Sequence, residues 1–173
     1  MRITDLLDKQ SISLNGAPKD KKEALDQVVD LMAKSGKIND VEAYRQRVYA
    51  REEESTTGIG EGIAIPHGKC DAVTKPGLAA MVVKDGVDFA SLDDEPVTLL
   101  FLIAAPNTKD NVHLDVLSKL SVLMMDENFS DSLRNASSVE EFLSIIDKAD
   151  AEQAGIDERL TAGSGEEAAD RNG

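Results

Sequence analysis

The side chain best suited to chemistry in this sequence is the imidazole of His67, which follows the glycine-rich residues 58–62 and lies between Pro66 and Gly68. Pro66 fixes its own φ angle and favours an extended residue before it, while Gly68 leaves the backbone free to turn sharply. We therefore expect an imidazole at a strand end with open space beside it. With an unperturbed pKa of about 6.5, it is substantially neutral near pH 7 and offers a nucleophilic lone pair without a separate base.

The second of the two histidines, His113, falls in a helical pattern. It shares the predicted helical face with Leu117, Leu120 and Met124. One interpretation is a structural histidine in the first helical turn, and the other is a side chain that orients His67. His67 and Cys70 form a His-x-x-Cys pair, but two ligands do not make a structural zinc site and no second pair has suitable spacing. We expect no metal and no cofactor.

Capped helices and apolar strands alternate around these residues. Asp20 with Glu23 predicts a helix over residues 21–35, and Asn39 with Glu42 predicts a second that ends near residues 51–53. Strands are predicted over residues 12–14, 63–65, 78–83 and 97–105, the last apolar enough to be central. Further helices are predicted after Asp110 or Asn111, around residues 129–133, and from the Ser138–Glu141 pair onward.

The composition indicates one domain with an appendage. A chain of 173 residues with 41% apolar residues can bury one sizeable core. From residue 150 the sequence turns to alanine, glycine and acidic residues, with two bulky apolar side chains, Ile156 and Leu160. We therefore predict a domain over residues 1–148 and an acidic flexible tail or interdomain linker over residues 149–173. A linker would make the chain the first part of a longer protein.

The formal net charge of −14 argues against nucleic acid or an anionic membrane surface as the main partner, since both attract basic patches. The single cysteine excludes an internal disulfide, and the N-terminus has no apolar signal core. The longest strongly apolar run, residues 97–105, is far too short for a membrane span. We expect a cytoplasmic chain with no direct membrane insertion.

Residues 51–68, REEESTTGIGEGIAIPHG, resemble the active-site signature of the fructose/mannitol-type enzyme IIA domains (EIIA type 2) of the bacterial sugar phosphotransferase system. The similarity continues through residues 111–114, where the family carries a second histidine, and covers approximately residues 1–148. The resemblance implies a three-layer α/β/α sandwich with a mixed central β-sheet flanked by helices, and the order of predicted elements accommodates this fold.

The resemblance also implies a phosphoryl relay. In this family phospho-HPr donates to the histidine that matches His67, which passes the group to a cysteine of an enzyme IIB domain for use by a membrane-bound enzyme IIC domain. The match through residues 85–87 and 100–107 is nearest to the fructose branch. Such a chain is expected in the cytoplasm, or tethered to the inner face of the membrane through a longer polypeptide. The alternative is a regulator resembling the nitrogen-related enzyme IIA proteins, which bind targets according to the phosphorylation of that histidine.

Transfer between two nitrogens requires alignment and the spreading of negative charge rather than a metal. The candidates for that task are the Arg51 guanidinium, the helix N-terminus that bears His113, and the backbone N–H groups around Gly58, Gly60 and Gly68. His113 would orient His67 or contact the phosphoryl group. Arg51 is equally well explained as a last-turn cation that suits the helix dipole, and Thr57 either caps a loop or contacts the phosphoryl group.

Two further expectations concern the surroundings of the site. The apolar residues Ile59, Ile63 and Pro66 are expected to form the rim that a protein partner contacts. The acidic run at residues 52–54 is expected to be a solvated helix end.

Overall fold

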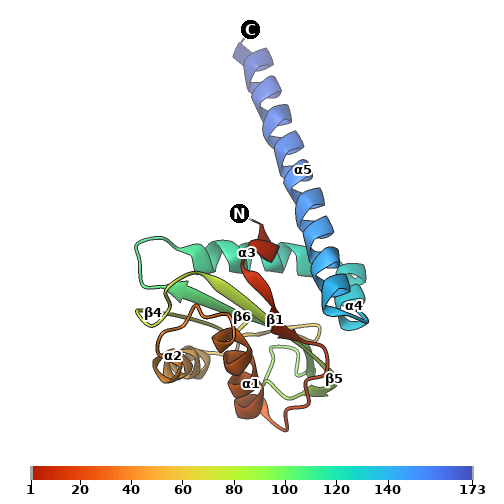
Figure 1. Ribbon diagram of the computed structural model, residues 1–173. Coiled ribbons are helices and arrows are strands. Elements are labelled where there is room, and N and C mark those ends of the chain that lie inside the picture. The colour runs from red at the N-terminus through yellow and green to blue at the C-terminus, as the bar shows by residue number, and fades with distance from the viewer. Residues whose placement is uncertain (1, 173) are drawn as a thin grey trace.

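The computed structural model describes the backbone of residues 2–172 and the side chains of residues 2–160 (Figure 1). The strands are β1 (Leu7–Ser13), β2 (Gly58–Gly60), β3 (Ile63–Ala64), β4 (His67–Cys70), β5 (Gly77–Val87) and β6 (Val97–Pro106). The helices are α1 (Lys21–Ala33), α2 (Val41–Glu54), α3 (Val112–Met124), α4 (Glu127–Arg134) and α5 (Val139–Asn172), preceded by a 3-10 turn at Ile3–Asp5.

The apolar strand β6 lies at the centre of a mixed sheet. The sheet order is β1-β5-β6-β3-β2, and β4 also pairs with β6. β5 runs antiparallel to β6, whereas β3 and β4 run parallel to it, one after the other along its other edge. Alternate side chains of β6 are buried in opposite cores, with Phe101 and Ile103 on one face and Leu100 and Leu102 on the other. The predicted central strand is confirmed.

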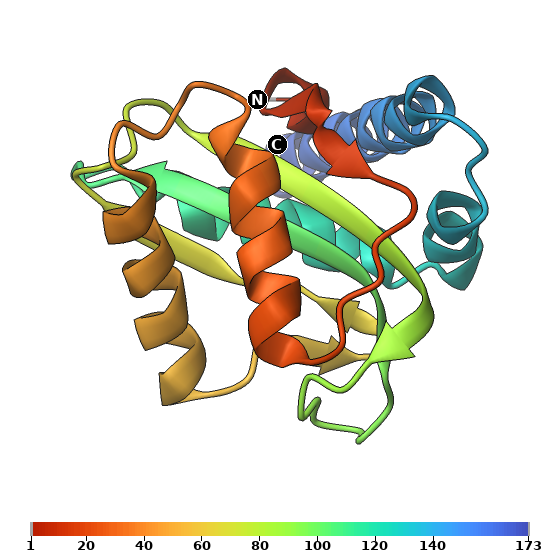
Figure 2. The same cartoon turned by 60° about the horizontal axis from the view of Figure 1, so that its bottom comes forward.

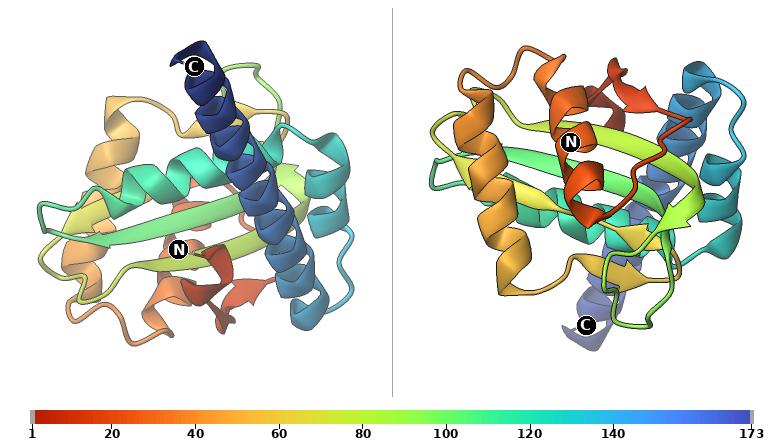
Figure 3. Two further views of the ribbon diagram at one scale, coloured as in Figure 1. Left: turned by 90° about the horizontal axis from the view of Figure 1, so that it is seen from above. Right: turned by 90° about the horizontal axis from the view of Figure 1, so that it is seen from below.

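Helices cover both faces of this sheet. α1 and α2 lie across one face, as Figure 2 shows, and pack on it through an apolar core that includes Val28 and Val48. α3, α4 and the first turns of α5 cover the other face, where Leu120 and Phe142 are buried (Figure 3). The three-layer α/β/α sandwich implied by the resemblance is confirmed.

The predicted caps at Asp20 and Ser138 form and the cap of the second helix is shifted, while Asn111 precedes α3 without a side-chain cap hydrogen bond. The Asp20 carboxylate accepts from the Glu23 amide (2.9 Å) and begins α1 where predicted. The second helix is capped by Asp40, whose carboxylate accepts from the amide of residue 43, and the predicted cap at Asn39 is wrong. Asn39 still belongs to the loop before the helix, where its amide donates to the carbonyl of Ala72 (2.8 Å).

The last helix extends well beyond the sheet. α5 begins after Ser138, whose hydroxyl accepts from the Glu141 amide (3.0 Å), and continues to Asn172, away from the body of the domain (Figure 1). Beyond residue 150 it buries little, since Ile156 and Leu160 are 41% and 65% exposed. The division into a domain and an acidic tail stays a prediction. Within the described backbone, no helix is long and apolar enough to cross a membrane.

The start of α5 is fixed to the N-terminus of the chain. The Asp150 carboxylate is buried, accepts from the Ile3 amide (2.7 Å) and pairs with Lys119 on α3 (3.2 Å). One turn earlier, Asp147 pairs with Arg2 (2.6 Å). These contacts join α5 to the rest of the sandwich as far as residue 150, two residues beyond the predicted end of the domain.

Candidate functional site

The first strand residue after Pro66 is His67, which lies opposite Ile103 of β6. Gly68 does not end the strand, as the sequence suggested it would, but continues it. A Cβ atom built on Gly68 would lie 3.1 Å from Val48 of α2, so glycine here permits the close approach of a helix rather than a turn. Because side chains alternate along a strand, His67 projects to the opposite face, toward α3.

The imidazole of His67 is oriented by its own backbone. Its Nδ1 atom lies 3.2 Å from the carbonyl oxygen of Ile65. Because a carbonyl oxygen only accepts, this contact assigns the proton of the neutral ring to Nδ1 and leaves the lone pair on Nε2. The side chain is partly exposed, so the nucleophilic nitrogen belongs to an accessible residue.

The chain connection brings the second histidine to the same place. β4 lies beside the last residues of β6, and the chain leaves β6 through a short loop into α3. The first turn of α3 therefore returns to the end of the sheet that carries His67. The ring centroids of His67 and His113 are 6.2 Å apart, with 32° between their planes. The structure thus brings together two residues that are far apart in the sequence.

Both imidazoles are neutral near pH 7. Burial lowers the pKa of His67 below its usual range, and the Arg51 charge lowers this pKa further. The hydrogen bond to Ile65 and the carboxylates of Glu52 and Glu54 act in the opposite direction but do not cancel the effect of burial. Burial likewise lowers the pKa of His113, with contributions from His67 and the Lys69 ammonium. The site therefore contains two uncharged rings, one of which has a free lone pair.

One ring nitrogen of His113, Nδ1, has no described hydrogen-bond partner, and this atom is buried. An unpaired buried N–H group is the rarer arrangement in proteins, so we assign the proton to Nε2 and leave Nδ1 as the unpaired acceptor. His113 then has an Nε2–H donor available for a group bound near His67.

Arg51 lies in the last turn of α2, where its guanidinium donates to the carbonyl (3.0 Å) and the hydroxyl (3.4 Å) of Ser55. This is the helix-end position that the dipole interpretation describes. The Arg51 charge nevertheless acts on His67, since it contributes to lowering the pKa of that ring. Its contact with a phosphoryl group stays a prediction.

Thr57 is held by a carboxylate that the sequence analysis assigned to solvent. Glu52 is 7% exposed, and its two oxygens accept from the Thr57 amide (2.9 Å) and the Thr57 hydroxyl (2.7 Å). The Lys21 ammonium pairs with the same carboxylate at 2.8 Å. The expectation of a solvated acidic run is therefore wrong for Glu52. Its burial was recognisable, because Tyr44, Val48 and Glu52 recur every four residues on one helical face.

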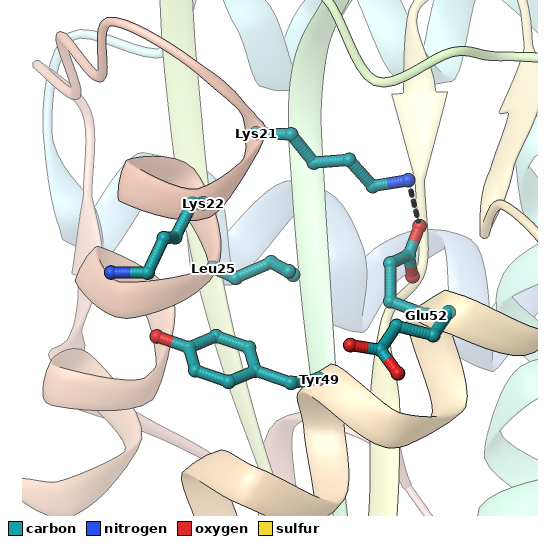
Figure 4. Close-up of a pocket in the computed structure, with 6 residues that line it drawn as sticks. Lys21, Lys22, Leu25, Tyr49 and Glu52 are labelled. Atoms are coloured by element: carbon teal, nitrogen blue, oxygen red, sulfur yellow. Dashed lines mark ion pairs between the residues drawn. The ribbon is translucent and has the colours of Figure 1, made fainter.

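The ion pair of Lys21 and Glu52 lies in a cleft of about 460 Å³ between α1 and α2. Figure 4 shows the Lys21 side chain extending toward Glu52, with Leu25 and Tyr49 beside them. Neither histidine lines this cleft. At this cleft, α1 and α2 together support the segment that leads into the site. The contact of Thr57 with a phosphoryl group stays a prediction.

The tip of the glycine-rich hairpin points away from His67. β2 runs antiparallel to β3, with Gly58 opposite Ala64 and Gly60 opposite Ile63, so the turn lies beyond the far end of β3. The Gly58 amide already donates to the Thr56 hydroxyl (3.1 Å). The hairpin tip therefore lies away from the ring of His67, and a contact between the glycine amides and a phosphoryl group stays a prediction.

The predicted apolar rim is also wrong in part. Ile63 is 2% exposed and lies in the core on the α3 side, and Pro66 is buried as well. Ile59 is exposed but belongs to the hairpin that turns away from the site. The exposed apolar side chain nearest in sequence to a site histidine is Leu114, which directly follows His113 in the first turn of α3.

The fold and the paired imidazoles define a class: an α/β sandwich domain that presents a partly exposed histidine, with a second histidine beside it, at one end of its sheet. The family model of the phosphoenolpyruvate-dependent sugar phosphotransferase system, EIIA 2, matches residues 5–149. The chain belongs to this family, whose members are phosphotransfer components.

Curated relatives support the same assignment. The chain is 45% identical over 150 residues to the fructose-specific EIIABC component of Bacillus subtilis, a match that covers 87% of this chain and 24% of that protein. It is 39% identical over 136 residues to the fructose-specific EIIA component of Haloferax volcanii, covering 79% of this chain and 88% of that protein. The chain thus spans about a quarter of one relative and most of the other.

Solved structures of the family have the same fold. The nitrogen regulatory protein IIA-Ntr from Neisseria meningitidis superposes with a TM-score of 0.78 at 30% identity, covering 83% of this chain and 98% of that one. The mannitol enzyme IIA of Escherichia coli, solved in complex with phosphorylated enzyme IIB, gives a TM-score of 0.71 at 29% identity, with coverage of 82% and 98%.

Proposed function

We propose that His67 accepts a phosphoryl group from phospho-HPr and passes it to a cysteine of an enzyme IIB domain, for the uptake of a sugar of the fructose type. The observation that carries this proposal is the contact between Nδ1 of His67 and the Ile65 carbonyl, because it leaves the lone pair on Nε2. The lowered pKa of His67, caused by burial, keeps that lone pair unprotonated near pH 7.

In the proposed step, the Nε2 lone pair of His67 forms a bond to phosphorus while the bond from phosphorus to the donor nitrogen breaks and leaves its electron pair on HPr. The Nδ1 proton stays on the ring, held by the Ile65 carbonyl. In onward transfer a cysteine thiolate attacks phosphorus, and the electron pair of the P–N bond returns to Nε2. Alignment and charge stabilisation supply the catalysis, since the transferred group needs little covalent assistance.

The neighbouring residues have proposed roles in this step. His113 donates from Nε2 to a phosphoryl oxygen, or orients His67. Arg51 contacts the phosphoryl group by leaving Ser55, a movement that its position at the last turn of α2 allows. Thr57 ranks last, because its hydroxyl reaches a phosphoryl oxygen only by leaving the Glu52 carboxylate.

The relatives support a transport role over a regulatory one. Identity is 45% to a fructose-specific EIIABC protein and 30% to the nitrogen regulatory protein whose fold is similar. The complex of mannitol enzyme IIA with phosphorylated enzyme IIB is consistent with the proposed acceptor. We propose that the domain is cytoplasmic, either as a separate component or tethered to the inner face of the membrane by a polypeptide that joins α5 to enzyme IIB and IIC domains.

The test is to incubate the chain with ³²P-labelled phospho-HPr and then to add a fructose-type enzyme IIB domain. One acid-labile label is expected, absent in His67→Ala and retained in Cys70→Ser, and it should move to the enzyme IIB cysteine. Label that persists in His67→Ala would reject the assigned acceptor. Label that remains on the chain in the presence of fructose- and mannitol-type enzyme IIB domains would favour the regulatory alternative.

A further inference from the structure

We infer that Lys69 is a phosphoryl-binding residue, whose ammonium pairs with the phosphoryl group on His67 from the α3 side of the site. The inference rests on the proposed function and adds to it the cation that meets the transferred charge on that side.

The strand geometry places Lys69 beside the nucleophile. His67 lies opposite Ile103 and Lys69 opposite Ala105, so both belong to one regular strand, with Cα atoms roughly 7 Å apart. Residues two apart on a strand face the same side, and Gly68 between them faces α2. Lys69 therefore projects toward α3, as His67 does.

The position of the ammonium agrees with this direction. The Nζ atom of Lys69 lies 3.5 Å from the carbonyl oxygen of Asp110, in the loop that leads into α3. Its charge also contributes to the lowered pKa of His113, after burial and the effect of His67. The other charged group that acts on this ring is Asp115, on α3 itself. Lys69 is thus close to both histidines.

Lys69 is also available to a new anion. Its side chain is partly buried, and within residues 2–160 no carboxylate lies within 4 Å of its ammonium. Most partly buried lysines and arginines of this acidic chain are paired with carboxylates. The described polar contact of the Lys69 ammonium is instead one long hydrogen bond to a carbonyl oxygen. An ammonium in this state gains a charge-assisted hydrogen bond when an anion arrives.

Phosphorylation supplies that anion. A phosphoryl group carries a charge of about −1.5 to −2 near pH 7, whereas both imidazoles start neutral. Arg51 lies on the α2 side and is bonded to Ser55. On the α3 side, Lys69 is the cation whose charge acts on His113, and the ring of His113 is itself neutral.

The experiment compares Lys69→Gln with Lys69→Arg and with Lys75→Gln, which removes an exposed lysine from the loop after β4. Each chain is phosphorylated by phospho-HPr, and the phosphoryl group is titrated by ³¹P NMR. Lys69→Gln is expected to raise the phosphoryl pKa by about 0.5–1 unit and to slow acceptance roughly tenfold, the size of one charge-assisted hydrogen bond. Lys69→Arg and Lys75→Gln should behave as the unsubstituted chain does.

A second readout separates charge from folding. In the unphosphorylated chain, Lys69→Gln should raise the pKa of His113 by ¹⁵N NMR, because one of the charges that lowers it is removed. If the unsubstituted chain carries its label on His67 while Lys69→Gln titrates and transfers unchanged, the inference is overturned and the proposed function stands. If the unsubstituted chain takes no label from phospho-HPr, both fail.

Discussion

The two sides of the histidine site differ in how completely their polar groups are bonded. On the α2 side, Arg51 donates to Ser55, and the buried Glu52 carboxylate receives the amide and hydroxyl of Thr57 and the ammonium of Lys21. On the α3 side, one nitrogen of His113 is buried without a described partner, and the Lys69 ammonium has a single long hydrogen bond to a carbonyl.

This difference indicates that the α2 side supports the structure of the site, whereas the α3 side responds to a bound phosphoryl group. A saturated network such as that around Glu52 holds its residues in one arrangement, because breaking any bond leaves a buried polar group unpaired. The sparsely bonded groups on the α3 side can turn toward a phosphoryl group without losing strong contacts. We therefore expect substitutions on the α2 side to lower stability first, and substitutions on the α3 side to lower transfer rates first.

The largest effect is expected for Glu52→Gln. The change removes the negative charge that Lys21 and Thr57 share, and the free energy of unfolding should fall by about 3 kcal/mol, as for the loss of one partner of a buried pair. Urea denaturation measures it, and Glu53→Gln at the exposed next position is the matched control. Equal stability of the two variants would show that the Glu52 network does not support the fold.

His113→Ala tests the opposite side. Loss of the Nε2–H donor should slow onward transfer about 10- to 100-fold, equivalent to roughly 1.5–3 kcal/mol for one hydrogen bond to a charged group. The free energy of unfolding should change by less than about 1 kcal/mol, because the substitution also removes an unpaired buried nitrogen. Quenched-flow transfer to enzyme IIB and urea denaturation provide the two values. A large loss of stability with an unchanged transfer rate would show that His113 supports the fold rather than phosphoryl transfer.

Thr57→Val keeps the shape of the side chain and removes its hydroxyl. Glu52 then loses one of its donors, and the free energy of unfolding should fall by about 1–2 kcal/mol. The rate of phosphoryl acceptance from phospho-HPr should fall only to the extent that losing this hydrogen bond makes the Gly-rich segment more mobile. If acceptance instead falls more than tenfold while stability holds, Thr57 is a direct phosphoryl contact; Thr57→Ser, which retains the hydroxyl, serves as the control.

The smallest effect concerns pH. Burial lowers the pKa of both histidines in the folded chain, so the unfolded chain binds protons more tightly and stability rises with pH. This contribution is complete above the unfolded value of about 6.5 and is lost as the pH falls through the lowered folded values. Urea unfolding across this range should show a shallower pH dependence in the His67→Ala, His113→Ala double variant. An identical slope would mean that neither ring is desolvated.

Much of the fold was predictable because its signals are local. The carboxylate of Asp20 accepts a hydrogen bond from an amide only three residues further along the chain. The apolar run at residues 97–105 predicts a strand buried on both faces, whatever its position in the sheet. The error at Asn39 arose because two neighbouring residues can each cap a helix, and a tertiary contact with Ala72 decided between them.

His67 was recognisable in the sequence because its neighbours Pro66 and Gly68, and the resemblance of residues 51–68, lie in one continuous segment. The burial of Glu52 was missed, although its spacing from Tyr44 and Val48 places it on the inner face of the helix. A carboxylate is normally assigned to solvent, and the cation that makes its burial possible, Lys21, lies on a different helix.

The sequence by itself predicted most of the helices, the central strand, the apolar faces and His67 as the candidate phosphoryl acceptor, because each depends on residues within a few positions of one another. The tertiary structure decided how the groups around His67 are arranged. The register of β4 against β6 and the return of the chain into α3 bring His113 to 6.2 Å from His67. The same register turns Lys69 toward α3, and the packing of α1 on α2 closes Glu52 from solvent. Such contacts join distant residues through sheet pairing, which local sequence patterns do not specify.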